Sequence, residues 1–218
     1  MTGRSPLIVG TVLLAIALVA TLPLRLVLPN GYFTARVVSG SIWSGQLENV
    51  RLGRIALGTM RAAYRPLARL RVSSDSGLTA EIGWGGRLSN LNGIVAASGA
   101  LAPFPVEAIE FRQVSVSAGK SGCSEAEGRV RLTLSSAGSG LPPGAVLVGP
   151  LRCTEGDLTT RLVSQSGLDT LDLRFRSDRR FQAAMTVRPA DQEAITKLQA
   201  LGFRQSPTGY QLTVSGRF

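Results

Sequence analysis

Histidine is absent from this 218-residue chain, and its absence removes several kinds of chemistry at once. Without an imidazole the chain has no Ser-His-Asp or Cys-His catalysis, no histidine-ligated metal and no histidine pH switch. Cysteine is nearly absent as well, and two residues cannot build a four-thiolate zinc site. The composition therefore predicts no catalytic residue, no metal site and no cofactor.

Acidic residues are also scarce, with 14 Asp and Glu against 24 Lys and Arg, which gives a formal net charge of +10. The acids are scattered without a recognisable pairing, although the sequence leaves open a carboxylate pair of the glycosidase type. Ser44 lies outside any Gly-x-Ser-x-Gly elbow, and no phosphate-binding glycine loop is present. We expect a protein without enzymatic activity.

Aromatic residues make up only 6% of the chain, whereas Gly and Pro are frequent, with 25 and 11 residues. This composition is typical of many short strands joined by turns. The hydrophobic fraction of 44% is too high for wholesale disorder. The length predicts one folded domain, or two at most.

Charge is missing altogether from Ser5 to Leu24, a run made mostly of Leu, Ile, Val and Ala. As a helix rising about 1.5 Å per residue, this run would cover the roughly 30 Å hydrocarbon core of a bilayer. We expect a membrane-spanning signal anchor over residues 6–28, a cytoplasmic tail over 1–5, and a domain outside the cytosol over 32–218. Two alternatives are a signal peptide cleaved near Ala15–Ala17 and a buried core helix.

Alternation of apolar and polar residues dominates residues 32–218 and indicates strands with one buried face. The predicted strands are 34–39, 47–52, 59–64, 78–84, 109–117, 129–134, 145–151, 157–164, 171–176, 181–187 and 210–218. One short helix is predicted at about 190–201, because its apolar residues form one stripe. The expected fold is therefore mainly β, an extended or curved antiparallel sheet that follows the membrane helix. A second sheet, the helix, the membrane or a partner would have to cover its apolar face.

The only two cysteines, Cys123 and Cys153, lie in the part expected outside the cytosol, where paired cysteines are oxidised. We predict a structural disulfide between them, since their spacing is far too long for a Cys-x-x-Cys redox site. Closing this loop of about 31 residues would stabilise the fold by roughly 3–4 kcal/mol in the chain-entropy model.

The stretch from Tyr32 to Arg71 carries seven Arg and a single acid, Glu48. Next to a membrane helix it favours anionic lipid head groups or an acidic partner surface, and a merely solvated basic face is the alternative. A basic chain can also bind nucleic acid, but neither interleaved aromatics nor a helix-turn-helix pattern accompanies the charge. We expect no nucleic-acid partner.

Short motifs follow the anchor in an order that resembles the type II secretion system protein N (general secretion pathway protein N) family over essentially the whole chain. The residues that carry the likeness most specifically are Gly40, Trp43 and Gly45 near the start, and Gly202, Phe203, Gly209 and Tyr210 near the end. The cysteine pair fits this order as well.

The resemblance implies a single-pass protein of the bacterial inner membrane, with its amino terminus in the cytoplasm and its main domain in the periplasm. It implies a non-enzymatic accessory of type II protein secretion that contacts other inner-membrane and periplasmic components of the machinery. The strand-rich part is also similar to AsmA-like envelope proteins. This second likeness implies an alternative function, in which an apolar groove of the sheet holds lipid.

The motif residues also have readings of their own, apart from the family. Trp43 is expected to pack at a tight strand-turn corner, and the alternatives are a binding anchor or a contact with the membrane interface. Phe203 is expected to pin the helix to the sheet, and Tyr210 to belong to the core.

Overall fold

The computed structural model describes residues 21–24, 34–52, 55–65, 69–83, 85, 87–98, 102–119, 121–135, 144–189 and 191–217. Within these residues the strands are β1 (Val37–Ser41), β2 (Ser44–Leu52), β3 (Ile55–Arg65), β4 (Arg69–Ser74), β5 (Thr79–Gly83), β6 (Arg87–Ala96), β7 (Val106–Gly119), β8 (Gly122–Leu134), β9 (Val146–Thr154), β10 (Asp157–Ser164), β11 (Thr170–Phe175), β12 (Arg180–Val187), β13 (Arg204–Ser206) and β14 (Gly209–Arg217).

All fourteen described strands belong to one sheet, and neighbouring strands are antiparallel. Their order in the sheet is their order in the chain from β1 to β12, followed by β14 and then β13 at the edge. Most strands therefore pair with the strand that comes immediately before or after them.

The two faces of the sheet differ in polarity because apolar and charged residues alternate along its strands. On β8, Val130, Leu132 and Leu134 are buried, whereas Arg129 and Arg131, which alternate with them, are exposed. We call the face that carries the buried residues the inner face and the opposite one the outer face.

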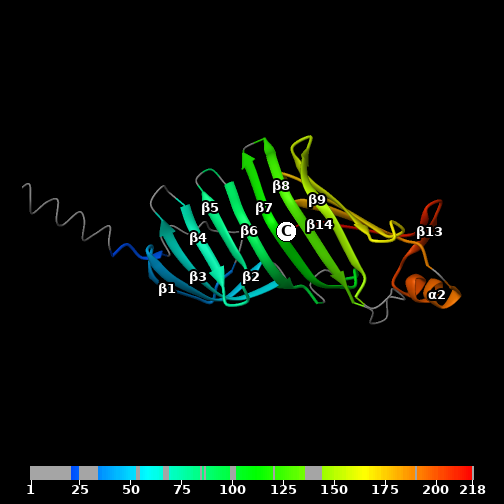
Figure 1. Ribbon diagram of the computed structural model, residues 1–218, viewed down its shortest axis with the longest axis horizontal. Coiled ribbons are helices and arrows are strands. Elements are labelled where there is room, and N and C mark those ends of the chain that lie inside the picture. The colour runs from blue at the N-terminus through cyan, green and yellow to red at the C-terminus, as the bar shows by residue number, and fades with distance from the viewer. Residues whose placement is uncertain are drawn as a thin grey trace, which may run out of the picture.

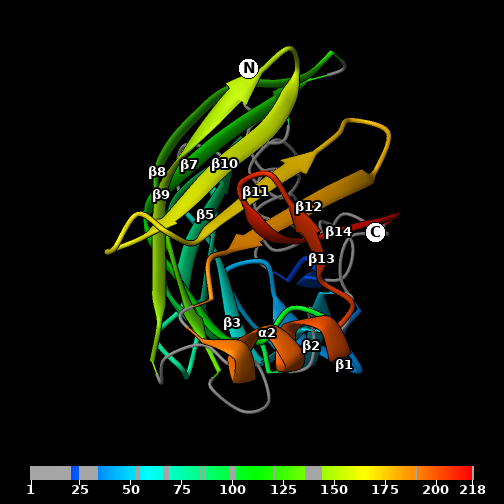
Figure 2. The same cartoon turned by 90° about the vertical axis from the view of Figure 1, so that its right-hand side faces the viewer.

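The sheet is strongly curved, as the two perpendicular views show (Figure 1, Figure 2): the β1–β3 end and the β11–β14 end turn toward the same side. Two clusters of buried side chains lie on the inner face, one from the first half of the sheet and one from the second half with the helix. Leu91 and Phe111 pack against both clusters and join them. Curvature and the helix thus bury much of the apolar face, for which the sequence alone identified no cover, while Leu91 and Phe111 stay only partly buried.

The described residues contain one α-helix, α2 (Gln192–Ala200), between β12 and β13. Asp191 caps its start by accepting a 2.8 Å hydrogen bond from the Ala194 amide. Ala194 and Leu198 form its buried side, and Leu198 belongs to the larger core cluster. The helix predicted at about 190–201 is confirmed, with ends a residue or two inside those expected.

The predicted antiparallel, mainly β fold is confirmed, but β4, β6 and β13 were not predicted. The strand expected at 34–39 is in fact β1 (Val37–Ser41), with Thr34 in an isolated bridge to Arg51. Pairing of Gly40 with Gly45 lets the β1–β2 hairpin continue beyond Ser39, because neither residue has a side chain to block it.

Most of the membrane helix predicted over residues 6–28 lies outside the described residues, which begin at Thr21. The predicted helix is not formed over Thr21–Leu24. Pro23 instead makes an isolated bridge with Ser41, and the Leu22 carbonyl accepts a 3.0 Å hydrogen bond from the Ile42 amide. Leu24 is fully buried in the smaller core cluster. In the part of the chain that the structure describes, no helix has the length and apolar character required to cross a bilayer.

Candidate interaction surface

The Gly40, Trp43 and Gly45 motif forms the tight hairpin between β1 and β2. Gly40 has a φ of +86° and leaves no room for a Cβ, which would overlap the Ser44 carbonyl oxygen. A Cβ on Gly45 would overlap the Leu24 side chain. Both positions therefore require glycine. Gly40 packs against the opposite strand of the hairpin, and Gly45 packs against Leu24 in the segment that precedes the hairpin.

Trp43 occupies the turn of this hairpin and is 43% exposed. Its ring meets that of Tyr64 on β3 edge to face, with ring centroids 6.2 Å apart and planes at 85°. The Tyr64 amide also donates a 2.7 Å hydrogen bond to the Ile42 carbonyl. One side of the indole is thus packed while the rest stays accessible, so both the packing role and a contact role fit its position.

The two cysteines form a disulfide that joins β8 to β9, with Cα atoms 5.5 Å apart. The last paired residues of these strands on this side are Arg129 and Pro150, so the disulfide lies beyond the ladder. The Cys123 amide also donates a 2.7 Å hydrogen bond to the Gly156 carbonyl in the β9–β10 turn. The disulfide and this hydrogen bond hold together strand ends that the sheet itself does not pair.

The closing motif surrounds the end of α2. Gly202, with φ of +93°, ends the helix, and the Phe203 amide donates a 3.0 Å hydrogen bond to the Leu198 carbonyl. Phe203 is buried in the larger cluster, and Tyr210 is partly buried against it. Gly209, with φ of +140°, lies where a Cβ would come within 2.6 Å of the Val187 carbonyl oxygen.

The structure does not bring these three predicted groups together. The Trp43 hairpin lies at the β1 end of the sheet, whereas α2 and β13 lie at the opposite end (Figure 1). The disulfide lies between them, on β8 and β9. The motif residues therefore mark separate packing points, and no single site contains them.

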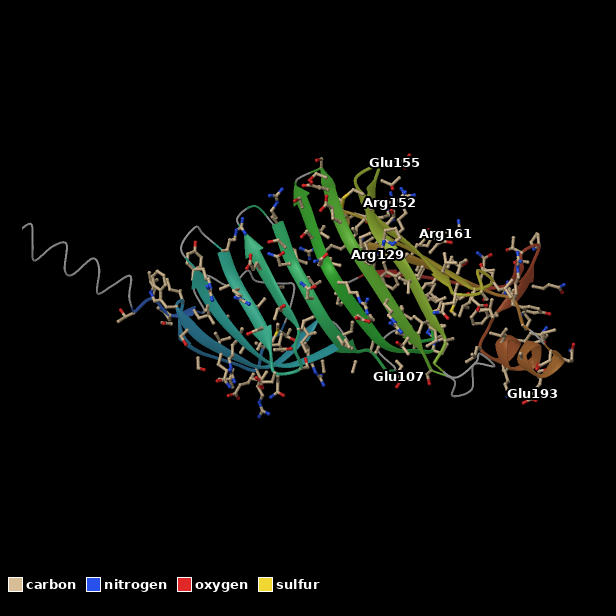
Figure 3. The ribbon with its side chains drawn as sticks, in the orientation of Figure 1. Glu107, Arg129, Arg152, Glu155, Arg161 and Glu193 are labelled. Carbon is tan, nitrogen blue, oxygen red and sulfur yellow. A yellow bond between two sulfur atoms is a disulfide. The ribbon has the colours of Figure 1, made fainter. Side chains whose placement is uncertain are left out.

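The sequence did not identify the most distinctive surface, which is a cluster of arginines on the outer face of β8, β9 and β10. Figure 3 shows Arg129, Arg152 and Arg161 on these three strands, with Glu155 at the end of the β9–β10 hairpin. Arg131 is paired in register with Val148, which is itself paired with Val163. The arginines therefore surround a small apolar strip, in which Val148 is 41% exposed.

A groove of about 580 Å³ opens beside this strip, across β9 to β12. The residues that line it are Pro150, Arg152, Thr159, Thr160, Arg161, Val163, Asp172, Leu173, Arg174, Gln182 and Ala184. Its charged members are three Arg and one Asp, so the lining combines apolar groups with net positive charge. We call this groove, together with Arg129 and Val148, the basic groove.

Neighbouring acids neutralise some of these arginines. Arg174 donates hydrogen bonds to Asp157 (2.6 Å) and Glu155 (3.2 Å), and these bonds, with Asp157 the stronger cause, raise the pKa of its guanidinium. Glu110 similarly raises the pKa of Arg112, mainly by a 2.6 Å hydrogen bond.

Other arginines are less well compensated. Arg161 approaches Asp172 only to 3.7 Å, which is outside hydrogen-bond distance. Arg129 and Arg152 are exposed and make no ion pair with any residue that the structure describes. The positive charge of the basic groove therefore rests mainly on these three side chains.

The alternation of residues 129–134 and 157–164 signals an arginine-bearing outer face. What a single sequence does not show is which predicted strands are neighbours in the sheet. The arginines of β8, β9 and β10 come together only because these strands pair in chain order.

The comparisons with known proteins address the family directly. The family model of type II secretion system (T2SS), protein N, matches residues 33–213. No curated protein and no solved structure matches the chain. The matched residues run from just before β1 into β14 and include every motif residue named above. On this evidence the chain belongs to the type II secretion system protein N family.

Proposed function

We propose that the protein is a non-enzymatic accessory of the type II secretion machinery that works by contacting other components of it in the periplasm. Membership of the family, which is a family of this machinery, carries the proposal. The exposed basic groove supports a role in contact, since apolar groups surrounded by arginines are a common composition for protein interfaces. An enzymatic role has no support from a cluster of reactive side chains in the described residues.

We also propose that an inner-membrane anchor, predicted over residues 6–28 but ending before the folded segment Thr21–Leu24, tethers the periplasmic domain. The uncharged run from Ser5 to Leu24 supports this anchor. The contacts of Leu22, Pro23 and Leu24 with the β1–β2 hairpin support a short connection between the anchor and the sheet. Trp43 lies in that hairpin, where an aromatic side chain could also meet the membrane interface.

Deleting the gene and restoring it with the full chain tests the proposal. We expect the deletion to reduce secretion of exoproteins or the amount of assembled machinery, and the full chain to restore it. Mild crosslinking in the complemented strain should recover other secretion components with the chain. A chain in which a cleaved signal peptide replaces residues 1–20, so that Leu22, Pro23 and Leu24 keep their contacts with the sheet, is the matched control for the anchor. Normal secretion in the deletion strain, together with recovery of no secretion component, would contradict the proposal.

Lipid binding on the inner face remains the alternative, and it requires an apolar face that a lipid can reach. The innermost residues of the two core clusters, such as Leu147 and Met185, are fully buried and out of reach of a lipid, whereas Leu91 and Phe111 between the clusters are only partly buried. Lipid that copurifies with the full chain and is retained through delipidation would revive this alternative.

A further inference from the structure

We propose that the basic groove is a docking site for an acidic, extended segment of a partner protein. The inference rests on the proposed function, because it supplies the surface and the partner chemistry for the contact proposed there. It combines three features of the outer face: arginines that have no ion pair, or only a loose one, with the described residues, an exposed apolar strip, and a groove that crosses four strands.

The first argument is the charge that folding leaves uncompensated. Arg129 is paired in register directly opposite Arg112, although like charges at such positions destabilise a sheet. Glu110 on the same strand as Arg112 already pairs with Arg112 and Arg131, at 2.6 and 3.9 Å. Among the described residues no acid forms an ion pair with Arg129, and a carboxylate from another molecule would relieve this repulsion.

The second argument is the chemistry of the arginines. A guanidinium binds a carboxylate through two parallel hydrogen bonds, which gives direction as well as attraction. Asp157, only 10% exposed in its side chain, holds Arg174 in place, so one wall of the groove is fixed. Arg161 is 70% exposed and only loosely paired, so an incoming carboxylate can compete with Asp172 for it.

The third argument concerns the apolar groups between the charges. Val148 of β9 lies in register between Arg131 of β8 and Val163 of β10. Pro150, which is paired with Arg129, lies between Val148 and Arg152 along β9. A peptide in extended form presents side chains at alternating positions to such a surface. Acidic side chains could then meet the arginines while an apolar one covers the exposed part of Val148.

A protein segment fits this surface better than a membrane does. Glu155, Asp157 and Asp172 lie among the arginines and would repel a dense layer of phosphates. The described residues nearest the proposed anchor lie at the β1 end (Figure 1), and β9 is eight strands farther along the sheet. At about 4.8 Å per strand this is roughly 40 Å along the sheet, several times the Debye length of about 8 Å.

The test uses the full chain in detergent and a fluorescent eight-residue peptide of alternating Glu and Leu. Fluorescence anisotropy measures its Kd, and the same peptide with Gln in place of Glu is the control ligand. We expect the Glu peptide to bind at least about tenfold more tightly, since charge-assisted hydrogen bonds are about twice as strong as neutral ones. Equal affinity for the two peptides, or no binding of either, would overturn the proposal.

Variants then locate the site. We expect R129Q/R152Q to raise the Kd of the Glu peptide about fivefold or more. R65Q, at an exposed arginine of β3 in the other half of the sheet, should leave the Kd unchanged. If R129Q/R152Q unfolds at a lower temperature than the wild type, the single variant R152Q replaces it in the binding measurement. An equal effect of R65Q and R129Q/R152Q would reduce the binding to general charge attraction and overturn the proposal. So would short-chain phosphatidylglycerol binding that depends on Arg129 and Arg152 while peptide binding does not.

A photocrosslinker in cells separates this proposal from the function on which it rests. Placed at Val148, it should capture a secretion component, and R129Q/R152Q should abolish that product. Ile94 of β6, 54% exposed and also apolar, is the matched control position. Secretion components captured from Ile94 but not from Val148 would overturn the docking site and leave the proposed function standing. The proposed function is tested separately by secretion in the deletion strain, and that result does not depend on peptide binding.

Discussion

At Gly40 a side chain has no space, so a single methyl group should weaken the β1–β2 hairpin. Besides its overlap with Ser44, a Cβ would lie 2.9 Å from the Gly45 Cα, and the φ of +86° adds backbone strain. We expect Gly40→Ala to lower the free energy of unfolding by about 2–4 kcal/mol. Thermal unfolding of the full chain, followed by circular dichroism, measures the change.

Gly119→Ala is the control for this substitution. Gly119 lies at the end of β7, where no atom comes within 4 Å of a built Cβ. Its unfolding temperature should match that of the wild type. An equal loss of stability in both variants would contradict the assignment of the effect at Gly40 to crowding and to its positive φ.

Trp43 should contribute only part of what a buried tryptophan does. It keeps 43% of its surface exposed and packs its edge against Tyr64. We expect Trp43→Ala to cost about 1 kcal/mol, against the 3–5 kcal/mol typical of a buried aromatic residue. Tyr64→Leu removes the same ring contact from the other side and serves as the control. Unchanged stability with reduced crosslinking to secretion components would assign Trp43 to contact alone, and a loss above about 3 kcal/mol would contradict the exposure seen here.

Among the elements, the β8–β9 pair depends on the disulfide at the end where its ladder has stopped. Reduction should lower the free energy of unfolding by about 3 kcal/mol, the value expected for a loop of this length. Denaturant unfolding of the wild type with and without reductant measures it. The Cys123→Ser/Cys153→Ser variant should match the reduced wild type and ignore reductant. Free labelling of both thiols in the native, oxidised chain would contradict the bond.

Helix α2 should depend on its cap less than on its buried side. Asp191→Ala removes the acceptor of the Ala194 amide and should cost about 1 kcal/mol. Leu198→Ala leaves a cavity in the larger cluster and should cost about 3 kcal/mol. Gln199→Ala, at an exposed position of the same helix, should be neutral in the same unfolding assay. A larger effect at Asp191 than at Leu198 would mean that α2 is held mainly by its end.

The elements also show why some strands could be predicted and others not. Along residues 129–134 of β8, and along β10, every second residue points to the inner face without interruption, so the alternation of apolar and polar residues is visible in the sequence. In β6 this alternation is interrupted. Its pairing with β7 shifts register between Leu88 and Leu91 and again between Leu91 and Gly93, where bulges occur. A period-two pattern cannot survive such shifts. β13 has only three residues, Arg204–Ser206, which is too short for any periodic signal.

For the whole molecule, the sequence predicted an extended or a curved sheet but could not decide between the two, and it did not predict the position of the basic groove. The curvature and the position of the groove depend on twist summed over many strands and on which strands are neighbours. The arginines were visible one by one, but their assembly around Val148 requires the register of β8, β9 and β10. The disulfide was predictable because the chain contains only two cysteines, so that only one pairing within the chain is possible.

Orientation in the membrane is also a property of the whole molecule. With the amino terminus of the proposed anchor in the cytoplasm, a reporter fused after Phe218 should lie in the periplasm. We expect alkaline phosphatase to be active there and β-galactosidase fused at the same point to be inactive. Each reporter is the control for the other. Inactive alkaline phosphatase together with active β-galactosidase would contradict the proposed topology.

The chain-order arrangement of the sheet has a consequence for biogenesis. A translocated polypeptide emerges with its amino-terminal part first, and here each new hairpin can pair at once with the strand that has just arrived. No early strand waits exposed for a distant partner until β12, whose second neighbour, β14, arrives only after α2 and β13. With the export that we propose, translocation and sheet growth can proceed together from β1 onward, and the last hairpin completes the structure.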